Sequence, residues 1–345
     1  MKKNDSLIKT KIDLFELLGE LFIKSISFIS FIVIILIFIF VFREAKYTFI
    51  QHEQSTTNPE ELVQETYGDV PDELGQGNTG YESLETSGHG GVATIDNLLS
   101  NEWQPVSANP KYGLIPLAVG SLKVTIIAIL FGAPIAILAA IYTSIFANKK
   151  LKEIIKPTIE ILASFPSVVI GFFALVIMAT FFQNLFGYQF RLNAFVGGVA
   201  LSLAIIPIIY TITDDAINTI PKYWTEASLA LGANKWQTAF FVVLPAAIPG
   251  IFAALILGFG RAFGETMIVL MATGNAGFTS ASPFDPVRTL SATIGAEMAE
   301  VIFGEVHYGL LFLIGSILFI FTFTLNAIAE FYIRGKLLKR FRGEV

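Results

Sequence analysis

The chain has 345 residues, 54% of them hydrophobic, and its mean hydropathy of +0.66 excludes an ordinary soluble domain. Disulfides and cysteine-ligated metals are excluded because the chain has no cysteine. The formal net charge of −5 excludes little by itself, since the charges are gathered in a few segments. At about 20 apolar residues per membrane crossing, the chain has room for about five to seven spans and one modest polar segment.

The first long apolar run, SISFISFIVIILIFIFVF, covers residues 25–42 and follows a polar, lysine-containing segment at 1–24. The run is uncharged and just long enough to cross a bilayer. A signal peptide is the alternative, but residues 43–46 show no small-residue cleavage pattern and the charged region before the run is unusually long. We therefore predict an uncleaved first transmembrane helix.

Residues 43–116 form an acidic segment, with 12 Asp and Glu against three Lys and Arg. The part from 58 to 91 has few apolar residues and so little material for a core of its own. Two interpretations of that part stay open: a docking surface for an external partner, or a solvated and poorly ordered loop. The stretch WQPVSANPKYGLIPL, residues 103–117, mixes aromatic residues with prolines and is expected to be more ordered.

Five further apolar segments follow, at residues 117–146, 158–182, 193–212, 246–272 and 308–333. The segment at 158–182 contains Pro166 and Gly171. A proline inside a membrane helix leaves a carbonyl unpaired, so we expect this helix to be kinked and packed against others. Between the last two segments we expect a loop and then a short amphipathic helix over 291–306.

The basic residues predict the orientation. In a six-span arrangement, 16 of the 23 Lys and Arg fall on one side, in the two terminal segments and in the loops near 149–156 and 222–235. The positive-inside rule then places both termini in the cytoplasm. We predict a multi-pass protein of the inner membrane, with residues 43–116 in the periplasm, a cytoplasmic loop over 213–245 and a basic cytoplasmic tail at 336–345.

The predicted cytoplasmic loop has the pattern of two short helices. Glu226 is expected in a first turn, where a carboxylate favours the positive end of the helix dipole. Gly232 can take the positive φ that ends such a helix. A second short helix over 235–243 then leads to Pro245 at the membrane. These features predict a compact helix–turn–helix elbow on the inner face of the membrane.

The elbow resembles the EAA loop of ABC importer permeases, on the following residues in order: Glu226, Ala227, Gly232, Ala233, Leu244 and Pro245. In that family the elbow is the coupling helix, which docks into a groove on a cytoplasmic ATPase. Two further stretches, ASFPSVVIGFFAL at 163–175 and GRAFGETMIVL at 260–270, resemble the phosphate-specific permeases of the family. The extra N-terminal span and the R-A-x-G-E-T-M sequence favour the C-type subunit over its A-type sister. The resemblance covers residues 100–335.

This resemblance implies an all-α membrane protein, namely a type I ABC importer transmembrane domain with six helices: one extra N-terminal span and a five-helix core within 117–335. It implies phosphate transport with an A-type sister permease, a cytoplasmic ATPase dimer and a periplasmic phosphate-binding protein as partners, in contact with membrane lipid and not with nucleic acid. No cofactor is expected. The alternatives are another oxyanion, such as sulfate or molybdate, or a secondary transporter or channel that needs no ATPase.

A charged pair lies inside the fifth predicted span. Arg261 and Glu265 are four residues apart, so on a continuous helix they share a face and are able to touch. Ionisable groups inside a membrane cost free energy unless they are paired or face water. One interpretation is an ion pair that holds helices together. The other is an anion path, in which the guanidinium fork of Arg261 meets phosphate oxygens, Glu265 holds the guanidinium between passages and Thr266 adds a hydroxyl.

Three smaller predictions complete the pattern. Gly260 and Gly264 form a G-x-x-x-G pair that is typical of close helix packing in membranes. The histidines at 52, 89 and 307 have no metal-ligand spacing, so we interpret them as solvated and predict no metal site. The chain has no Walker A sequence, so it is not expected to be an enzyme, and ATP hydrolysis is assigned to another chain.

Overall fold

A computed structural model describes residues 14–55, 94–107 and 109–332. The predictions for residues 58–91 and for the tail at 336–345 lie outside these residues. The elements in chain order are α1 (Leu14–Ser55), α2 (Ile95–Leu98), β1 (Trp103–Gln104), β2 (Lys111–Tyr112), α3 (Leu114–Ile141), the π-helical turn η1 (Tyr142–Phe146), α4 (Lys149–Ala163), α5 (Ser167–Phe173), the π-helical turn η2 (Ala174–Met178), α6 (Ala179–Phe186), α7 (Ala194–Asn218), α8 (Lys222–Ala230), α9 (Lys235–Thr238), the π-helical turn η3 (Ala239–Val243), α10 (Leu244–Phe263), α11 (Met267–Ala272), α12 (Leu290–Glu297) and α13 (Val306–Tyr332).

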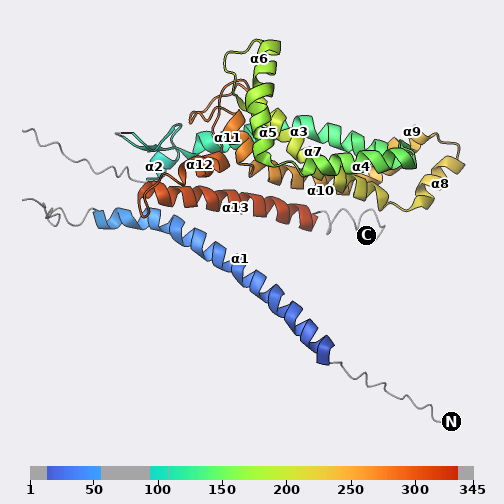
Figure 1. The fold of residues 1–345 in the computed structure, drawn as a ribbon, viewed down its shortest axis with the longest axis horizontal. Coiled ribbons are helices and arrows are strands. Elements are labelled where there is room, and N and C mark those ends of the chain that lie inside the picture. Colours follow the sequence, from blue (N-terminus) through green and yellow to red (C-terminus); the bar gives the residue numbers. More distant parts are fainter. Residues whose placement is uncertain (1–13, 56–93, 108, 333–345) are drawn as a thin grey trace, which may run out of the picture.

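Six helical segments of the described chain are long and apolar enough to cross a membrane, which confirms the predicted number. They are Gly19–Lys46, Leu114–Phe146, Ser167–Phe186, Ala194–Asn218, Lys235–Phe263 and Val306–Ala329. The helices α3, α7, α10 and α13 run side by side and form the bundle (Figure 1). We call the end that carries β1 and β2 the hairpin end, and the end that carries α8 and α9 the elbow end.

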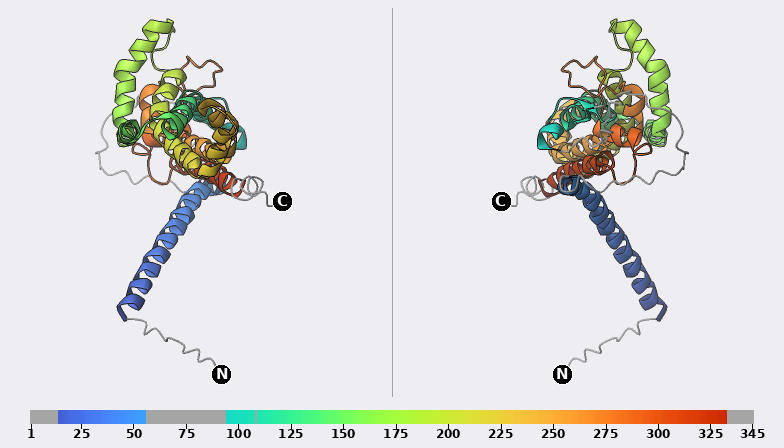
Figure 2. Two further views of the ribbon diagram at one scale, coloured as in Figure 1. Left: turned by 90° about the vertical axis from the view of Figure 1, so that its right-hand side faces the viewer. Right: turned by 90° about the vertical axis from the view of Figure 1, so that its left-hand side faces the viewer.

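The first helix, α1, joins the bundle through one part of its length. Phe38 packs edge-on against Phe319 of α13 with ring centroids 4.1 Å apart, and Phe40 meets Phe312 in the same way at 5.6 Å. The N-terminal part of α1 leads away from the bundle in each view (Figures 1 and 2). Its apolar side chains there are exposed on this chain, as expected for a helix that lies in lipid or against another membrane subunit.

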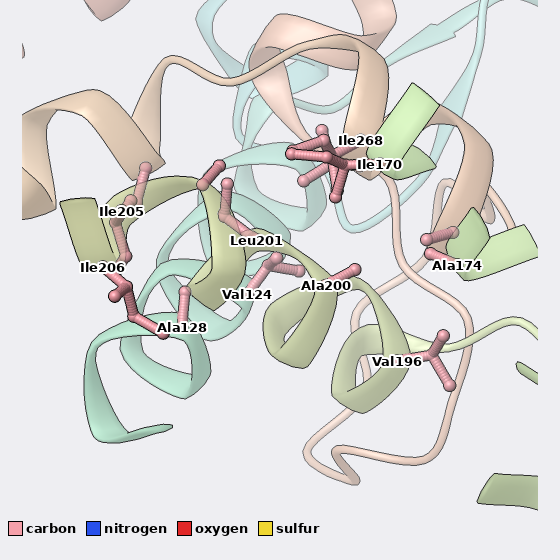
Figure 3. Close-up of a cluster of buried hydrophobic side chains, with 14 of the residues drawn as sticks. Val124, Ala128, Ile170, Ala174, Val196, Ala200, Leu201, Ile205, Ile206 and Ile268 are labelled. Carbon is pink, nitrogen blue, oxygen red and sulfur yellow. The ribbon is translucent and has the colours of Figure 1, made fainter. Parts of the chain in front are cut away.

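The core of the bundle is the contact between α3 and α7, and small residues make it close. At Gly198 of α7 an added Cβ would lie 2.5 Å from Ile127, and at Gly132 of α3 it would lie 3.1 Å from Ile205. Figure 3 shows the apolar cluster that surrounds this contact, to which α5 and α11 add Ile170 and Ile268. Lipid is as apolar as these side chains, so the close fit, more than their removal from water, favours the packed state.

The third predicted span is divided differently from the prediction. A single helix with a kink at Pro166 was expected over 158–182, but α4 ends at Ala163 and a new helix begins at Ser167 with Pro166 as its N-cap. A proline disfavours helical geometry in the residue before it, here Phe165, so the chain leaves the helix at this point. The helix α4 lies along α7, whereas α5, η2 and α6 stand crosswise to the bundle (Figures 1 and 2).

Two other segments also differ from the predictions. The fifth apolar segment was expected as one helix over 246–272, but α10 ends at Phe263 and α11 begins at Met267. The amphipathic helix expected over 291–306 is shorter, because α12 ends at Glu297. The intervening loop was predicted correctly. Lys123 of α3 holds it by donating to the carbonyl oxygens of Ser280 and, at 3.0 Å, Ser282.

Close packing of α7 against α10 generates a test with a matched control. An added Cβ at Gly250 would lie 2.2 Å from Ala216 Cβ, whereas at Gly260, on the same helix, the nearest described atom would be Asn326 Oδ1 at an ordinary 3.6 Å. We expect Gly250→Ala to lower stability by about 1–3 kcal/mol through overpacking. Gly260→Ala should leave stability unchanged or raise it by up to about 1 kcal/mol. The measurement is the thermal unfolding midpoint of each purified variant in detergent, and equal midpoints would contradict the packing.

Candidate functional site

The elbow consists of two short helices joined by a tight turn. At the end of α8 the Gly232 N–H donates to the Leu229 carbonyl and the Ala233 N–H donates to the Ser228 carbonyl. Gly232 has φ +90°, so the predicted positive φ is confirmed. These two bonds form a Schellman motif, which satisfies carbonyls that the helix end leaves unpaired. The helix therefore stops at a fixed place and angle.

The start of α9 is closed by a capping box that the sequence analysis did not identify. The Asn234 side chain accepts a hydrogen bond from the Gln237 N–H, and the Gln237 side chain accepts one from the Asn234 N–H, each at 2.8 Å. The spacing N-x-x-Q before an apolar run was the available signal. A bond of 3.0 Å between the Ser228 and Thr238 hydroxyls then joins α8 to the far end of α9. These bonds thus hold α8 and α9 in a fixed orientation relative to each other.

The structure changes the expected place of one elbow residue. Glu226 was expected in a first turn, but α8 begins at Lys222 and its first turn contains no acidic residue. Glu226 lies in the second turn with its side chain exposed, so it does not serve the dipole at the helix start. Leu231, beside the turn, is 91% exposed. Leu244 and Pro245 form the start of α10, as the prediction required.

The second site is the break between α10 and α11. Gly264 is the C-cap of α10, and the Glu265 N–H donates to the Ala262 carbonyl at 3.3 Å. Helical hydrogen bonding resumes where the Leu270 N–H donates to the Thr266 carbonyl. Glycine weakens a helix interior, which favours a break here. Across the break, Ser291 of α12 donates to the Glu265 carbonyl at 2.6 Å. A carbonyl released at membrane depth needs such a partner.

The break separates the two charged residues that were expected to share a helix face. Because α10 ends between them, Arg261 lies on the last turn of α10 and Glu265 lies in the non-helical segment. In the described part of the chain, no ion pair joins them. The Arg261 side chain is exposed on the surface of this chain and Glu265 is half-buried. The continuous helix face that was expected to carry both residues is therefore absent.

One contact, together with the lengths of α7 and α10, places this break within the length of the bundle. An added Cβ at Gly258 of α10 would lie 2.7 Å from Ile209 of α7, so these residues are at the same level. Toward the hairpin end, α7 extends about 15 residues beyond Ile209, as far as its first residue, Ala194. This length is about 22 Å at 1.5 Å per residue. From Gly258, α10 continues only about five residues. Arg261 therefore lies at depth in the bundle and not at its hairpin end.

The glycines that were predicted to allow close packing have different outcomes. Gly171 of α5 packs tightly on α11, where an added Cβ would lie 3.1 Å from the Met267 carbonyl oxygen and 3.2 Å from Ile268 Cα. Gly260 and Gly264 have no comparably close neighbour among the described residues. A further glycine was missed by sequence reasoning: at Gly295 of α12 an added Cβ would lie 2.6 Å from the Thr266 side chain. Only the fold brings these two residues together.

Comparison with known proteins is consistent with this geometry. Residues 132–336 match the family described as "Binding-protein-dependent transport system inner membrane component". The chain is 37% identical to the "Probable ABC transporter permease protein YqgH" of Bacillus subtilis over 71% of this chain and 79% of that protein. The chain belongs to the binding-protein-dependent ABC importer permeases.

Two further similarities concern a phosphate permease and the fold. The chain is 32% identical to the "Phosphate transport system permease protein PstC" of Mesorhizobium japonicum, over 68% of this chain and 76% of that protein. A solved bacterial ABC transporter involved in the import of the acidic polysaccharide alginate has a TM-score of 0.50 at 15% identity, over 70% of this chain and 83% of that one. This last similarity concerns the fold alone.

Family membership settles the general role of the chain. It is a multi-pass inner-membrane permease, and permeases of this kind assemble with ATPase subunits and with a periplasmic binding protein. The permease is not itself the ATPase. Among the described residues there is no group of His, Asp and Glu side chains able to hold a metal ion.

At the hairpin end of this permease, a buried polar cluster joins four segments. The Glu297 carboxylate of α12 accepts a hydrogen bond from Trp103 Nε1 at 3.0 Å, pairs with Arg288 at 2.5 Å and meets His307 Nε2 of α13 at 2.9 Å. His307 was interpreted as solvated, but its side chain is only 13% exposed because the hairpin covers it. Burial, with a smaller effect of the Glu305 charge, raises the pKa of Tyr112 beside this cluster.

Proposed function

We propose that this permease is the C-type subunit of a phosphate importer. The similarity to the PstC protein and the stretches at 163–175 and 260–270 support phosphate as the substrate. An A-type sister permease would complete the pore, a cytoplasmic ATPase dimer would drive it, and a periplasmic phosphate-binding protein would deliver the anion. The family consists of ABC importer components, so the alternative of a transporter or channel without an ATPase is set aside.

Arg261 is the observation that carries the proposal. It is exposed on the surface of this chain, at depth in the bundle, and the described residues offer it neither an ion pair nor a hydrogen bond. A guanidinium at this depth is costly in contact with lipid. We infer that this surface faces a water-filled path shared with the sister subunit. The rigid fork of donors on arginine suits the oxygens of phosphate.

Glu265 and Thr266 would line the same path beside Arg261. The break in α10 holds both outside a regular helix, next to Ser291 and Gly295 of α12. A carboxylate near the guanidinium would balance its charge when no anion is present, and the Thr266 hydroxyl would add a donor. An anion that reaches Arg261 would then exchange its hydration shell for fixed donors in a site of lower dielectric than water.

The elbow is the proposed contact with the ATPase. Its turn presents Leu231 with 91% of the side chain exposed and Glu226 exposed one turn before it. The polar bonds that hold α8 and α9 in a fixed shape suit a part that transmits force. On ATP binding, closure of the ATPase dimer would draw the two elbows of the permease pair together and open the path outward. Hydrolysis would reverse this movement.

Substitution of Arg261 tests the path. We expect Arg261→Gln to abolish phosphate uptake while the complex still assembles, because the substitution removes the positive charge and the guanidinium fork. Arg261→Lys should recover little uptake, since lysine keeps the charge but loses the bidentate fork. The measurement is phosphate uptake by cells, normalised to assembled complex. Sulfate and molybdate uptake by the unsubstituted complex, compared in parallel, tests the alternative oxyanions.

The companion variant in this test is Glu265→Gln combined with Arg261→Gln. If the two charges served structure alone, removing both would be tolerated better than removing one, because a lone charge at depth is the costly case. Under the proposal, the double variant stays inactive. Full phosphate uptake by the double variant would remove Arg261 from the path.

Substitution of Gly232 tests the elbow. Valine at φ +90° is strained by about 1–3 kcal/mol, so Gly232→Val should distort the turn without affecting membrane insertion. We expect the ATPase to co-purify at a much reduced level. Gly304 at the other end of the molecule has φ +87° and open space around it, so Gly304→Val is a matched control that should retain the ATPase. Equal ATPase retention in both variants would show that the elbow is not the contact.

The orientation with the elbow in the cytoplasm is also proposed, on the distribution of basic residues. The chain has no cysteine, so single cysteines report unambiguously on their own positions. Val106 at the hairpin end is 90% exposed and Leu231 at the elbow end is 91% exposed. On intact cells that lack the outer-membrane barrier, an impermeant maleimide should label Val106→Cys and not Leu231→Cys, whereas permeabilised cells should label both. The reverse pattern would invert the topology.

A further inference from the structure

A buried carboxylate at the elbow end belongs to neither the path nor the elbow surface. Asp214 lies on α7 with only 4% of its side chain exposed. Its Oδ2 pairs with Lys156 Nζ of α4 at 2.5 Å, and its Oδ1 accepts a hydrogen bond from Ser144 of η1 at 2.5 Å. One carboxylate thus joins three helical elements. Nothing in the proposed transport steps so far accounts for it.

Two more bonds converge on the same π-helical turn. Lys152 of α4 donates to the Ser144 carbonyl at 2.9 Å, and the Tyr210 hydroxyl of α7 bonds to Thr143 at 3.0 Å. We call Asp214, Lys156, Ser144 and Lys152 the inner clamp. A π-helical turn is a local departure from regular helix and often occurs at functional positions. Here the π-helical turn widens the C-terminal end of α3, at the residues that the inner clamp joins to α4 and α7.

The π-helical turn η1, which carries Ser144 of the inner clamp, contacts the elbow through aromatic rings. Phe146, the last residue of η1, lies against Trp236 of α9 with ring centroids 4.6 Å apart. Trp236 in turn stacks on Phe240 at 5.6 Å. A displacement of α9 therefore presses directly on the turn that holds Ser144. The contact is between rigid rings, so it has little freedom to absorb such a displacement.

The inner clamp is also connected, through α4 and α5, to the break between α10 and α11. The helix α4 carries both clamp lysines and ends at Ala163, and α5 begins after Pro166. The helix α5 packs through Gly171 on the first residues of α11, with an added Cβ 3.1 Å from the Met267 carbonyl oxygen. Thr266 directly precedes α11. The clamp therefore stands between the elbow and the residues proposed for the path.

We propose that Asp214 is a positioning residue that makes the elbow, η1 and α4 move as one body, so that movement of the elbow reaches α5 and the break. A carboxylate at such burial is strongly disfavoured without its partners, so separation of α4 from α7 is opposed by a charge-assisted bond. The consequence for transport rests on the proposed function, but the rigid link itself does not. A contiguous set of contacts alone does not demonstrate coupling, so the test measures the coupling directly.

The test uses spin labels in the complete complex of this permease with its partner subunits. Cysteines replace Ile154 of α4, which is 63% exposed, and Lys222 at the exposed start of α8. The distance distribution between the two labels is measured by pulsed electron paramagnetic resonance, with and without trapped ATP. We expect a narrow distribution that keeps its mean when ATP binds, because the two labels belong to one body.

The variant is Asp214→Asn combined with Lys156→Met, which leaves no unpaired buried charge. We expect its distribution to broaden and to shift on ATP binding. Lys156→Gln, which keeps the bond between Asp214 and Ser144, is a milder variant with the same expected direction. Asp215→Asn is the matched control, because Asp215 is the next residue and is exposed. A distribution that stays narrow in both variants, or that broadens equally in the control, would overturn the proposal.

A second readout separates positioning from a general loss of stability. In proteoliposomes, we expect the clamp variants to retain ATP hydrolysis while uptake per ATP falls about tenfold to a hundredfold, the order expected for loss of one charge-assisted bond. A proportional fall of hydrolysis and uptake would show a merely structural role. If the unsubstituted complex does not take up phosphate, the proposal that phosphate is the substrate is wrong. The spin-label distances still decide whether the clamp holds these elements together.

Discussion

The exclusion of unpaired polar groups from hydrocarbon governs this structure. A helix that crosses a membrane satisfies its own backbone, so any break in it must be covered by protein or open to water. The break between α10 and α11 meets this condition in two ways. Ser291 covers the Glu265 carbonyl from α12, and Gly295 lets α12 approach Thr266 closely enough to do so. Arg261 remains on the surface of the chain, which is the surface that we propose the sister subunit completes.

The same condition explains where the polar contacts are concentrated. The Glu297 cluster joins the hairpin, α12 and α13 at one end of the bundle, and the inner clamp joins η1, α4 and α7 at the other. Between them, α3 and α7 meet through glycine, alanine and branched aliphatic side chains. Apolar packing of this kind permits small sliding movements, whereas bonded ends hold their geometry. The opening and closing that we propose for this permease needs both properties, and the two kinds of contact lie in different parts of the bundle.

Most of the fold was predictable because membrane helices carry a strong local signal. Long apolar runs predicted six spans, and the described part of the chain contains six helical segments long and apolar enough to cross a membrane, since every residue in a span must be compatible with lipid or with a neighbouring helix. The elbow was predictable for a different local reason. Gly232 tolerates positive φ, and the residues around it end one short helix and begin the next. Where the sequence reasoning erred on Glu226, it placed the start of the helix about two residues too late, which propensity alone decides poorly.

The sequence by itself determined the number of spans, the elbow and the presence of charge within the fifth span, because hydropathy and backbone preference act over neighbouring residues. Only the tertiary structure decided that Arg261 and Glu265 lie on either side of a helix end, that Pro166 begins a helix standing crosswise to the bundle, and that His307 is buried. It also brought Asp214 to Lys156, 58 positions away in the chain, and Trp103 to Glu297. Such partners are chosen by the packing of whole helices, and no pattern within a single segment records which distant surface a side chain will meet.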